Sequence, residues 1–181
     1  PQKRERYILV GISPDIGGKF VPPSPQYVEM NYRTVRDAIG DLEEVEPSTE
    51  VTNDAIPLRH RDDLSPLARM LRGSMLYNHV CTASTTVAQE RFSALREGQN
   101  FHDLDASLKT TYSNAERTQN TIYMRLCYDL PSGTVVNVRK SMWVHPVLDR
   151  AVSIREAARL QTFPDSYVFE GSKDSQYQQV G

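Results

Sequence analysis

The first six residues of the chain, PQKRER, concentrate polar groups that could contact a polyanion. Lys3, Arg4 and Arg6 place three cations, together with Gln2, directly before an apolar run that begins at Tyr7. An arginine guanidinium presents a planar fork of donors that matches the geometry of a phosphate. A basic segment before a strand is also commonly a solvated edge, so the residue types alone leave both interpretations open.

Nucleophilic and metal-binding residue types are sparse. Cys81 and Cys127 are too few for a disulfide scaffold, and we expect two buried, non-catalytic thiols in a reducing, intracellular setting. Four scattered histidines have no cysteine or histidine neighbour at ligand spacing, so we predict no metal site. His79 is expected to be a buried, hydrogen-bonded histidine.

The elements that position these groups include a strongly marked helix near the end of the chain. In RAVSIREAARLQTFPD, residues 150–165, Ser153 precedes an apolar-periodic run and Glu156 follows three residues later, which is a capping box. A helix is therefore predicted over 153–163, and Pro164 ends it. One face carries small or apolar side chains that let another element approach closely: Ile154, Ala157, Ala158 and Gln161. A further helix is expected from about residue 175.

The remaining elements follow from shorter patterns. The apolar, β-forming run at 7–12 predicts a buried strand, and Thr34 is expected to cap a short helix that ends near residue 42. Residues 58–108 are mainly helical in pattern. The β-branched, alternating runs at 121–129 and 134–144, separated by a Pro-Ser-Gly turn, predict an antiparallel pair.

Charge is balanced overall but unevenly distributed. The 181 residues carry a net charge of −2, and no run approaches the ~20 apolar residues that a membrane-spanning helix needs. Residues 41–54 hold six acids and no base, whereas residues 109–150 hold six bases and three acids. Such segregation is expected if one face of the protein meets phosphates.

Several blocks, in this order, resemble signatures of the DNA (cytosine-5-)-methyltransferase family. The late block is similar to R-x-L-T-x-R-E-A-A-R-L-Q-x-F-P, with Val152 and Ser153 where Leu and Thr are usual. Residues 1–6 resemble the Gln-x-Arg-x-Arg element, and 34–42 the helix that commonly follows it. Residues 175–181 resemble the approach to the last signature, Q-x-G-N-x-V-P, and 123–146 the segment that precedes the late block.

This resemblance implies a mixed α/β (α+β) fold. We expect a smaller target-recognition domain with a short antiparallel sheet and several helices, plus one strand that belongs to the Rossmann-like, S-adenosylmethionine-dependent methyltransferase domain. The expected organisation is the last strand region of the large domain at 1–20, a connecting segment with a short helix at 21–57, the target-recognition domain at 58–165, and a return segment at 166–181.

The resemblance also assigns roles to residues. Arg4 and Arg6 would contact the flipped cytosine, Arg6 being the preferred base contact. Gln179 and Gly181 would belong to an element that reaches S-adenosylmethionine in the complete enzyme. Base-edge reading needs donors that project from a rigid loop, and the expected contacts to double-stranded DNA are Arg125, Asn137, Arg139, Lys140 and Ser141. An ordinary exposed turn is the alternative for this segment. Structural roles in the late helix fall to Ser153, Arg155, Glu156 and Gln161.

The family's nucleophile does not occur in these residues. The reaction needs a cysteine thiolate from a Pro-Cys pair, and no Pro-Cys, Glu-Asn-Val or Phe-x-Gly-x-Gly sequence is found. We therefore expect the C-terminal portion of a bacterial, cytoplasmic, nucleoid-associated methyltransferase that is inactive by itself and needs its missing catalytic portion. The alternatives are a natural second subunit of a split methyltransferase, with a complementary subunit as partner, and a non-catalytic, sequence-specific DNA-binding module.

Overall fold

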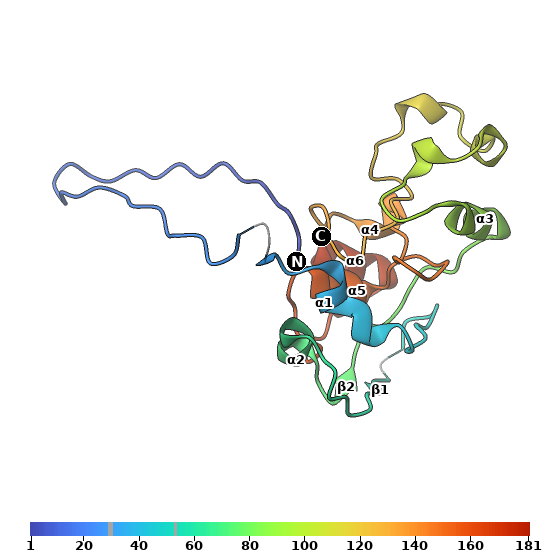
Figure 1. Cartoon of the computed structure of the whole chain (residues 1–181), viewed down its shortest axis with the longest axis horizontal. Coiled ribbons are helices and arrows are strands. Elements are labelled where there is room, and N and C mark those ends of the chain that lie inside the picture. Colours follow the sequence, from blue (N-terminus) through green and yellow to red (C-terminus); the bar gives the residue numbers. More distant parts are fainter. Residues whose placement is uncertain (29–30, 53) are drawn as a thin grey trace.

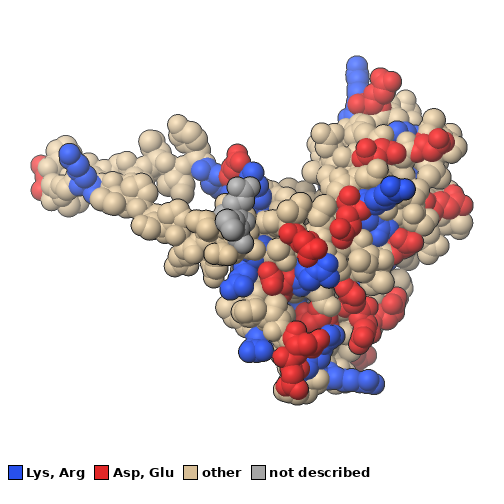
Figure 2. Space-filling view, viewed as in Figure 1, with Lys and Arg blue, Asp and Glu red and all other residues tan. Residues whose placement is uncertain are grey.

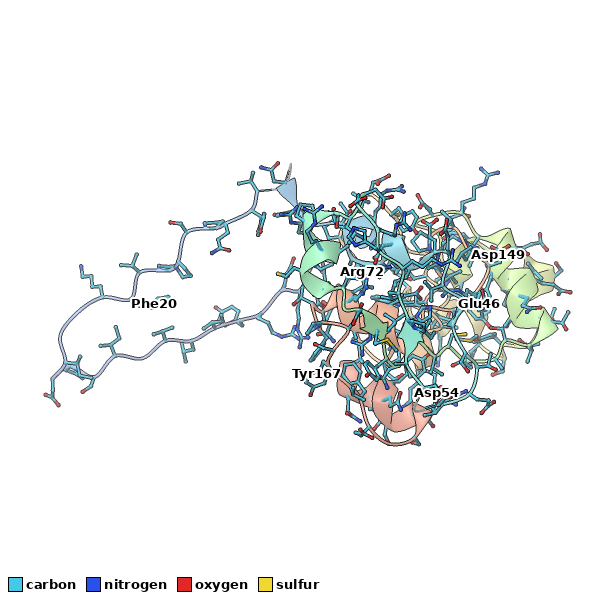
Figure 3. All side chains as sticks on the ribbon, turned by 90° about the horizontal axis from the view of Figure 1, so that it is seen from below. Phe20, Glu46, Asp54, Arg72, Asp149 and Tyr167 are labelled. Carbon is cyan, nitrogen blue, oxygen red and sulfur yellow. The ribbon has the colours of Figure 1, made fainter. Side chains whose placement is uncertain are left out.

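A computed structural model describes residues 1–28, 31–52 and 54–181. Residues 4–28 form a long excursion, here called the arm, that leaves the body of the protein and returns to α1, while the two ends of the chain lie close together (Figure 1). Tyr7 and Leu9 on the arm are 101% and 92% exposed. Phe20 likewise lies out on the arm, away from the body (Figure 3).

The buried strand predicted at 7–12 is wrong for this chain. Residues 7–12 have no strand assignment, and no backbone hydrogen bond joins them to any other described residue. A strand requires a neighbouring strand to accept and donate its ladder hydrogen bonds, and the described part of the chain places none beside the arm. The apolar pattern of the run is real, but its side chains remain in solvent.

The body is a layer of short helices packed around α5. The predicted short helix is confirmed as α1 (Val35–Ile39), which begins at a capping box made by Thr34 and Asp37 and continues as the 3₁₀ turn η2 (Gly40–Leu42). α2 (Pro66–Leu71), with Pro66 in its first turn, packs against α1. α5 (Ile154–Leu160) contacts α1 on one side and α6 (Lys173–Val180) on another. The body core lies between these helices and includes Ile39, Trp143 and Leu160.

The sheet is small and lies elsewhere than predicted. β1 (Ile56–Pro57) pairs antiparallel with β2 (Met75–Leu76), so the short antiparallel sheet is formed by residues on either side of α2. The predicted pair at 121–129 and 134–144 is wrong: only an isolated parallel bridge joins Arg125 to Val144, and residues 138–141 form the helical turn α4 (Val138–Ser141). The Asn137 side chain caps this turn by accepting from the Lys140 amide, an alternative to strand pairing that the alternating pattern did not reveal.

Residues 86–123 form a separate lobe (Figure 1), and its core also includes Val144 and Ala151 from the body. It contains α3 (Thr86–Ala94) and three 3₁₀ turns, η3 (Phe101–Asp103), η4 (Ala106–Lys109) and η5 (Ala115–Arg117). Arg91 is 4% exposed and lies over the rings of Phe101, Tyr112 and Tyr123. This arginine replaces part of the apolar packing that such a small lobe lacks.

Candidate functional site

The basic N-terminal block is attached to the segment 131–141, which we call the recognition segment. The Lys3 amide donates to the Ser132 carbonyl at 2.7 Å, and the Ser132 amide donates to the Pro1 carbonyl at 2.9 Å. The Thr134 hydroxyl adds a third hydrogen bond, to the Lys3 carbonyl, at 3.1 Å. Residues 1–3 therefore run as a short parallel ladder along residues 132–134, a contact between segments 130 residues apart in the sequence.

Two glutamines connect this ladder to the late helices. Gln2 Oε1 accepts from the Val135 amide at 3.0 Å, and Gln2 Nε2 donates to Gln161 Oε1 at 3.2 Å. Gln161 Nε2 in turn donates to the Val180 carbonyl in the last turn of α6. The N-terminal block, the recognition segment, the end of α5 and α6 thus meet at one place.

The chain end is packed into the same place. A Cβ at Gly181 would lie 2.8 Å from the Val136 carbonyl oxygen, so a side chain there requires the backbone to shift. Gln179 is exposed, and its Nε2 donates to the carbonyls of Glu170 and Ser175 within its own helical region. Both residues thus make their contacts within the described part of the chain, and their expected approach to S-adenosylmethionine stays a prediction for the complete enzyme.

Beyond this junction, the predicted base-contacting arginines are free of the body. Residues 3–12 are all exposed, and the Arg6 guanidinium donates only to the neighbouring Glu5 carbonyl among the described residues. Arg4 and Arg6 therefore stand at the base of the arm, directly after the ladder. The structure brings them near the recognition segment through the backbone of residues 1–3, although their own side chains point to no partner there.

The five predicted DNA contacts divide into two groups. Arg139 and Lys140 are exposed, and Asn137 is half-buried at the start of α4. Arg139 forms an ion pair with Asp174 of α6. Of the two neighbouring cations, Lys140 is therefore the one with fewer contacts to the protein. In Figure 2, exposed cations and acids alternate over the body, whereas the arm is largely uncharged between its base and its tip.

Arg125 and Ser141 are corrections to the expected contacts. Arg125 is 4% exposed, and its guanidinium donates to the carbonyls of Phe92 and His145 at 2.6 and 3.0 Å and to Asp149 at 2.5 Å. Ser141 is 5% exposed and its hydroxyl donates to the Asn137 carbonyl. Arg125 joins the lobe to the body instead, because a buried guanidinium must find acceptors inside the protein.

The late helix α5 contains buried ion pairs. Arg159 is fully buried; its Nε and Nη2 donate to the two oxygens of Asp165 at 2.8 and 2.6 Å, and its Nη1 donates to Asp41 at 2.5 Å. Arg72 from the end of α2 pairs with the other oxygen of Asp41. Burial by itself lowers the pKa of Arg159, but the hydrogen bonds and charges of the two carboxylates outweigh it and hold the pKa above its ordinary value.

Arg155 donates hydrogen bonds mainly to backbone carbonyls rather than to a carboxylate. Its Nε donates to the Tyr77 carbonyl at 2.7 Å, and its Nη atoms donate to the carbonyls of Pro164 and Tyr167 at 2.8 and 2.5 Å. These contacts give Arg155, like Arg159, a place inside the fold. Neither guanidinium reaches the surface.

The predicted capping box at the start of α5 is present and is enclosed. Ser153 Oγ accepts from the Glu156 amide at 3.0 Å, and the Glu156 carboxylate accepts from the Ser153 amide at 2.8 Å. Arg150 binds the same carboxylate through two donors, at 2.9 and 2.7 Å. Burial alone would raise the pKa of Glu156, but the hydrogen bonds and charge of Arg150 outweigh it, so the pKa lies well below its ordinary value.

Two buried histidines surround this carboxylate. His79 is 3% exposed; its Nδ1 lies 3.0 Å from the Ser153 hydroxyl and its Nε2 lies 2.8 Å from the Val45 carbonyl, as predicted for a hydrogen-bonded core histidine. His145 Nδ1 accepts from the amides of Val147 and Leu148. Burial lowers the pKa of both histidines, that of His145 to about 4.

Comparison with known proteins decides the family. The C-5 cytosine-specific DNA methylase family model matches residues 1–181. The chain belongs to this family. Type II methyltransferase M.DdeI of Desulfomicrobium norvegicum is 29% identical over 197 residues, covering 100% of this chain and 47% of the relative. Type II methyltransferase M1.HphI of Haemophilus parahaemolyticus is 30% identical over 181 residues, covering 100% of this chain and 40% of the relative.

The chain spans less than half the length of these relatives. A crystal structure assigned as a DNA modification methyltransferase encoded within a prophage of E. coli superposes with a TM-score of 0.58 at 21% identity, covering 81% of this chain and 41% of that one. The match supports the mixed helical and strand fold. No helix in the described ranges is long and apolar enough to cross a membrane.

Sequence reasoning missed the groups that bind the late helix from outside it. Asp41, Asp165 and His145 are buried, and each lies against a charged side chain of α5. Only Asp165 carried a usable signal, since it lies inside the late block itself. Cys81 is buried as predicted, while Cys127 is half-buried and both are free thiols.

Proposed function

We propose that this chain is the C-terminal, DNA-recognition part of a DNA (cytosine-5-)-methyltransferase whose complete form transfers a methyl group from S-adenosylmethionine to C5 of a flipped cytosine in double-stranded DNA. The observation that carries the proposal is the junction at Gln2. Three blocks that are far apart in the sequence meet there, and the cations Arg4, Arg6 and Lys140 extend from it into solvent. Such a junction holds a base-contacting segment and a base-reading segment at a fixed separation.

We also propose that residues 1–20 belong to the large Rossmann-like domain of the complete enzyme, residues 58–165 to the target-recognition domain, and residues 166–181 to the segment that returns to the large domain. The exposed apolar arm supports the first assignment. Tyr7, Ile8 and Leu9 are 101%, 78% and 92% exposed, which is the condition of a strand that lacks its sheet.

The 181 residues alone are proposed to be inactive. They contain no Pro-Cys pair, and burial raises the pKa of the thiols of both Cys81 and Cys127, which disfavours the thiolate needed for attack on cytosine. Transfer of labelled methyl groups from S-adenosylmethionine to DNA should be at background for this chain. Activity should appear when a protein that carries the Pro-Cys and cofactor segments is added, whether that partner is the rest of one polypeptide or a second subunit.

DNA binding by the chain itself is the direct test. Arg4→Ala and Lys140→Ala should each weaken binding to double-stranded DNA and reduce the slope of log K against log salt by about one, as expected for loss of a phosphate contact. Arg59→Ala is the matched control, because Arg59 is also an exposed cation, but it lies two residues after β1 and outside the junction. If all three variants bind like the parent chain, the proposed interface is wrong.

The non-catalytic DNA-binding module makes a different prediction from the enzyme part. Such a module would bind a preferred sequence tightly without any partner and would not restore methyl transfer to a complementary catalytic portion. The shared junction, which attaches residues 1–3, directly before Arg4 and Arg6, to the recognition segment, favours the enzyme part, because a pure binding module has no need of the base-contacting block.

A further inference from the structure

We propose that Gln2 and Gln161 form a directional amide relay that sets the position of the N-terminal basic block relative to the recognition segment, which makes both glutamines positioning residues. The relay has three consecutive hydrogen bonds: Val135 N–H to Gln2 Oε1 at 3.0 Å, Gln2 Nε2–H to Gln161 Oε1 at 3.2 Å, and Gln161 Nε2–H to the Val180 carbonyl. The expected effect of the relay on DNA affinity rests on the proposed function, whereas the hydrogen bonds of the relay do not.

The direction of the relay follows from its two ends. The Val135 amide can only donate and the Val180 carbonyl can only accept, so each terminal group selects one orientation of the glutamine beside it. Gln2 must then present Nε2 to Gln161, and Gln161 must present Oε1 to Gln2. Rotating either amide by 180° would place two donors or two acceptors against each other.

The backbone groups at the two ends of the relay are buried and depend on the glutamines for hydrogen bonds. Val135 and Val180 are 2% and 3% exposed, so their backbone groups have little access to water if a glutamine leaves. The Thr134 hydroxyl fixes the Lys3 carbonyl, one residue before Arg4. On the other side of Val135, the chain reaches Asn137 and α4 within two residues.

A loss of the relay should therefore act on the relative position of two segments rather than on the core. Both glutamines are half-buried, at the edge of the body core that includes Val135 and Val180. The ladder hydrogen bonds of residues 1–3 keep the block attached in the absence of the relay, but they fix one edge only. The side-chain relay supplies the second attachment, to α5 and α6.

Hydrogen exchange of the Val135 amide measures the coupling. Gln2→Leu removes its acceptor and should speed exchange about five- to tenfold, the expected effect of one net hydrogen bond. Gln161→Met touches no atom of Val135, yet it should also speed exchange severalfold, because Gln2 then loses the partner that orients it. Gln179→Met is the matched control: it removes an amide from the same stretch of chain outside the relay and should leave the rate unchanged.

Gln161→Glu separates the two halves of the relay. The carboxylate still accepts from Gln2, so Val135 should exchange at the parent rate. Its second oxygen faces the Val180 carbonyl without a proton to donate, so the amides of the last turn of α6 should exchange faster. This variant also serves if Gln161→Met fails to fold.

The exchange rates of the variants decide whether the relay exists. If Gln161→Met and Gln179→Met leave Val135 exchange equally unchanged, or if Gln161→Glu speeds it as much as Gln2→Leu does, there is no relay. If the relay exists and positions the basic block, Gln161→Met should lower the affinity for DNA. In the Gln161→Met background, Arg4→Ala should then reduce this affinity less than it does in the parent chain. In the Gln179→Met background, Arg4→Ala should reduce it as much as in the parent chain. Absence of DNA binding by the parent chain would contradict the proposed function and leave the exchange result to decide the relay.

Discussion

Arg159→Met should be the most damaging single substitution in the late helix. The change keeps an aliphatic side chain of similar length in α5 but removes the guanidinium, which donates to Asp165, Asp41 and the Ala38 carbonyl. Asp41 retains Arg72, whereas Asp165, which is fully buried, retains the Gly73 amide at 3.2 Å as its remaining hydrogen bond among the described residues. The main cost is therefore one buried carboxylate without a counter-charge.

Removing one partner of a buried ion pair costs about 3–5 kcal/mol, a large part of the ~5–15 kcal/mol that stabilises an ordinary domain. Urea unfolding followed by circular dichroism measures the loss. Arg61→Met is the matched control, because Arg61 also binds a carboxylate through two donors, at 2.9 and 2.7 Å to Asp63, but with 32% and 66% of the two side chains exposed. Such an exposed pair is worth about 0–1 kcal/mol.

A double variant identifies the cause. Arg159→Met with Asp165→Asn replaces the unpaired charge by a neutral amide and should recover part of the stability that the single change removes, since a neutral group costs less to bury. The reasoning is refuted if Arg159→Met and Arg61→Met lose the same free energy of unfolding within about 1 kcal/mol. It is also refuted if the double variant is less stable than Arg159→Met alone.

Three further predictions concern the groups around α5 and the lobe. Burial depresses the pKa of His145 from 6.5 to about 4, so the stabilisation by its neutral ring is complete above about pH 6.5 and is lost as the pH falls toward 4. Urea unfolding at pH 7.5 and 5.5 should therefore differ by roughly 1.4 kcal/mol because of His145, and His79, whose pKa burial also lowers, should add to this loss; a flat profile would contradict the burial of neutral rings. Ser153→Ala removes the cap of α5 and the hydroxyl partner of His79, so it should cost at least the ~1–2 kcal/mol of a lost N-cap, whereas Ser153→Thr should retain most of the stability. Gly98→Ala places a side chain at φ +79° and 3.2 Å from the Cys127 sulfur, so it should lower the thermal midpoint, whereas Gly133→Ala, with open space around it, should not.

The late helix shows how much of the structure was predictable from local patterns. Its start depends on hydrogen bonds between Ser153 and Glu156, three residues apart, and the same holds for Thr34 and Asp37 at α1. Interactions of this range lie within the sequence itself, so both helices were predicted with their caps. His79 was also assigned correctly to the interior.

Strands and surface contacts were the unpredictable part. Residues 7–12 have the composition of a strand, but a strand exists only beside another, and the described residues offer it none. Residues 134–144 alternate like a strand, yet Asn137 caps a helical turn there. At residues 7–12 the outcome depends on which segments meet in space, whereas at 134–144 a local cap competes with strand pairing and the alternating pattern does not show which of the two forms.

By itself, the sequence determined the family, the capped helices and the absence of a Pro-Cys nucleophile, because each is encoded in residues adjacent along the chain. Only the tertiary structure decided which cations are exposed and free to contact DNA. Arg125 and Lys140 both belong to the stretch 109–150, which is rich in basic residues. The Arg125 guanidinium is buried and donates to the carbonyls of Phe92 and His145, whereas Lys140 remains in solvent. The difference arises because a buried carbonyl without a donor is costly, and the folded chain brings those carbonyls to Arg125.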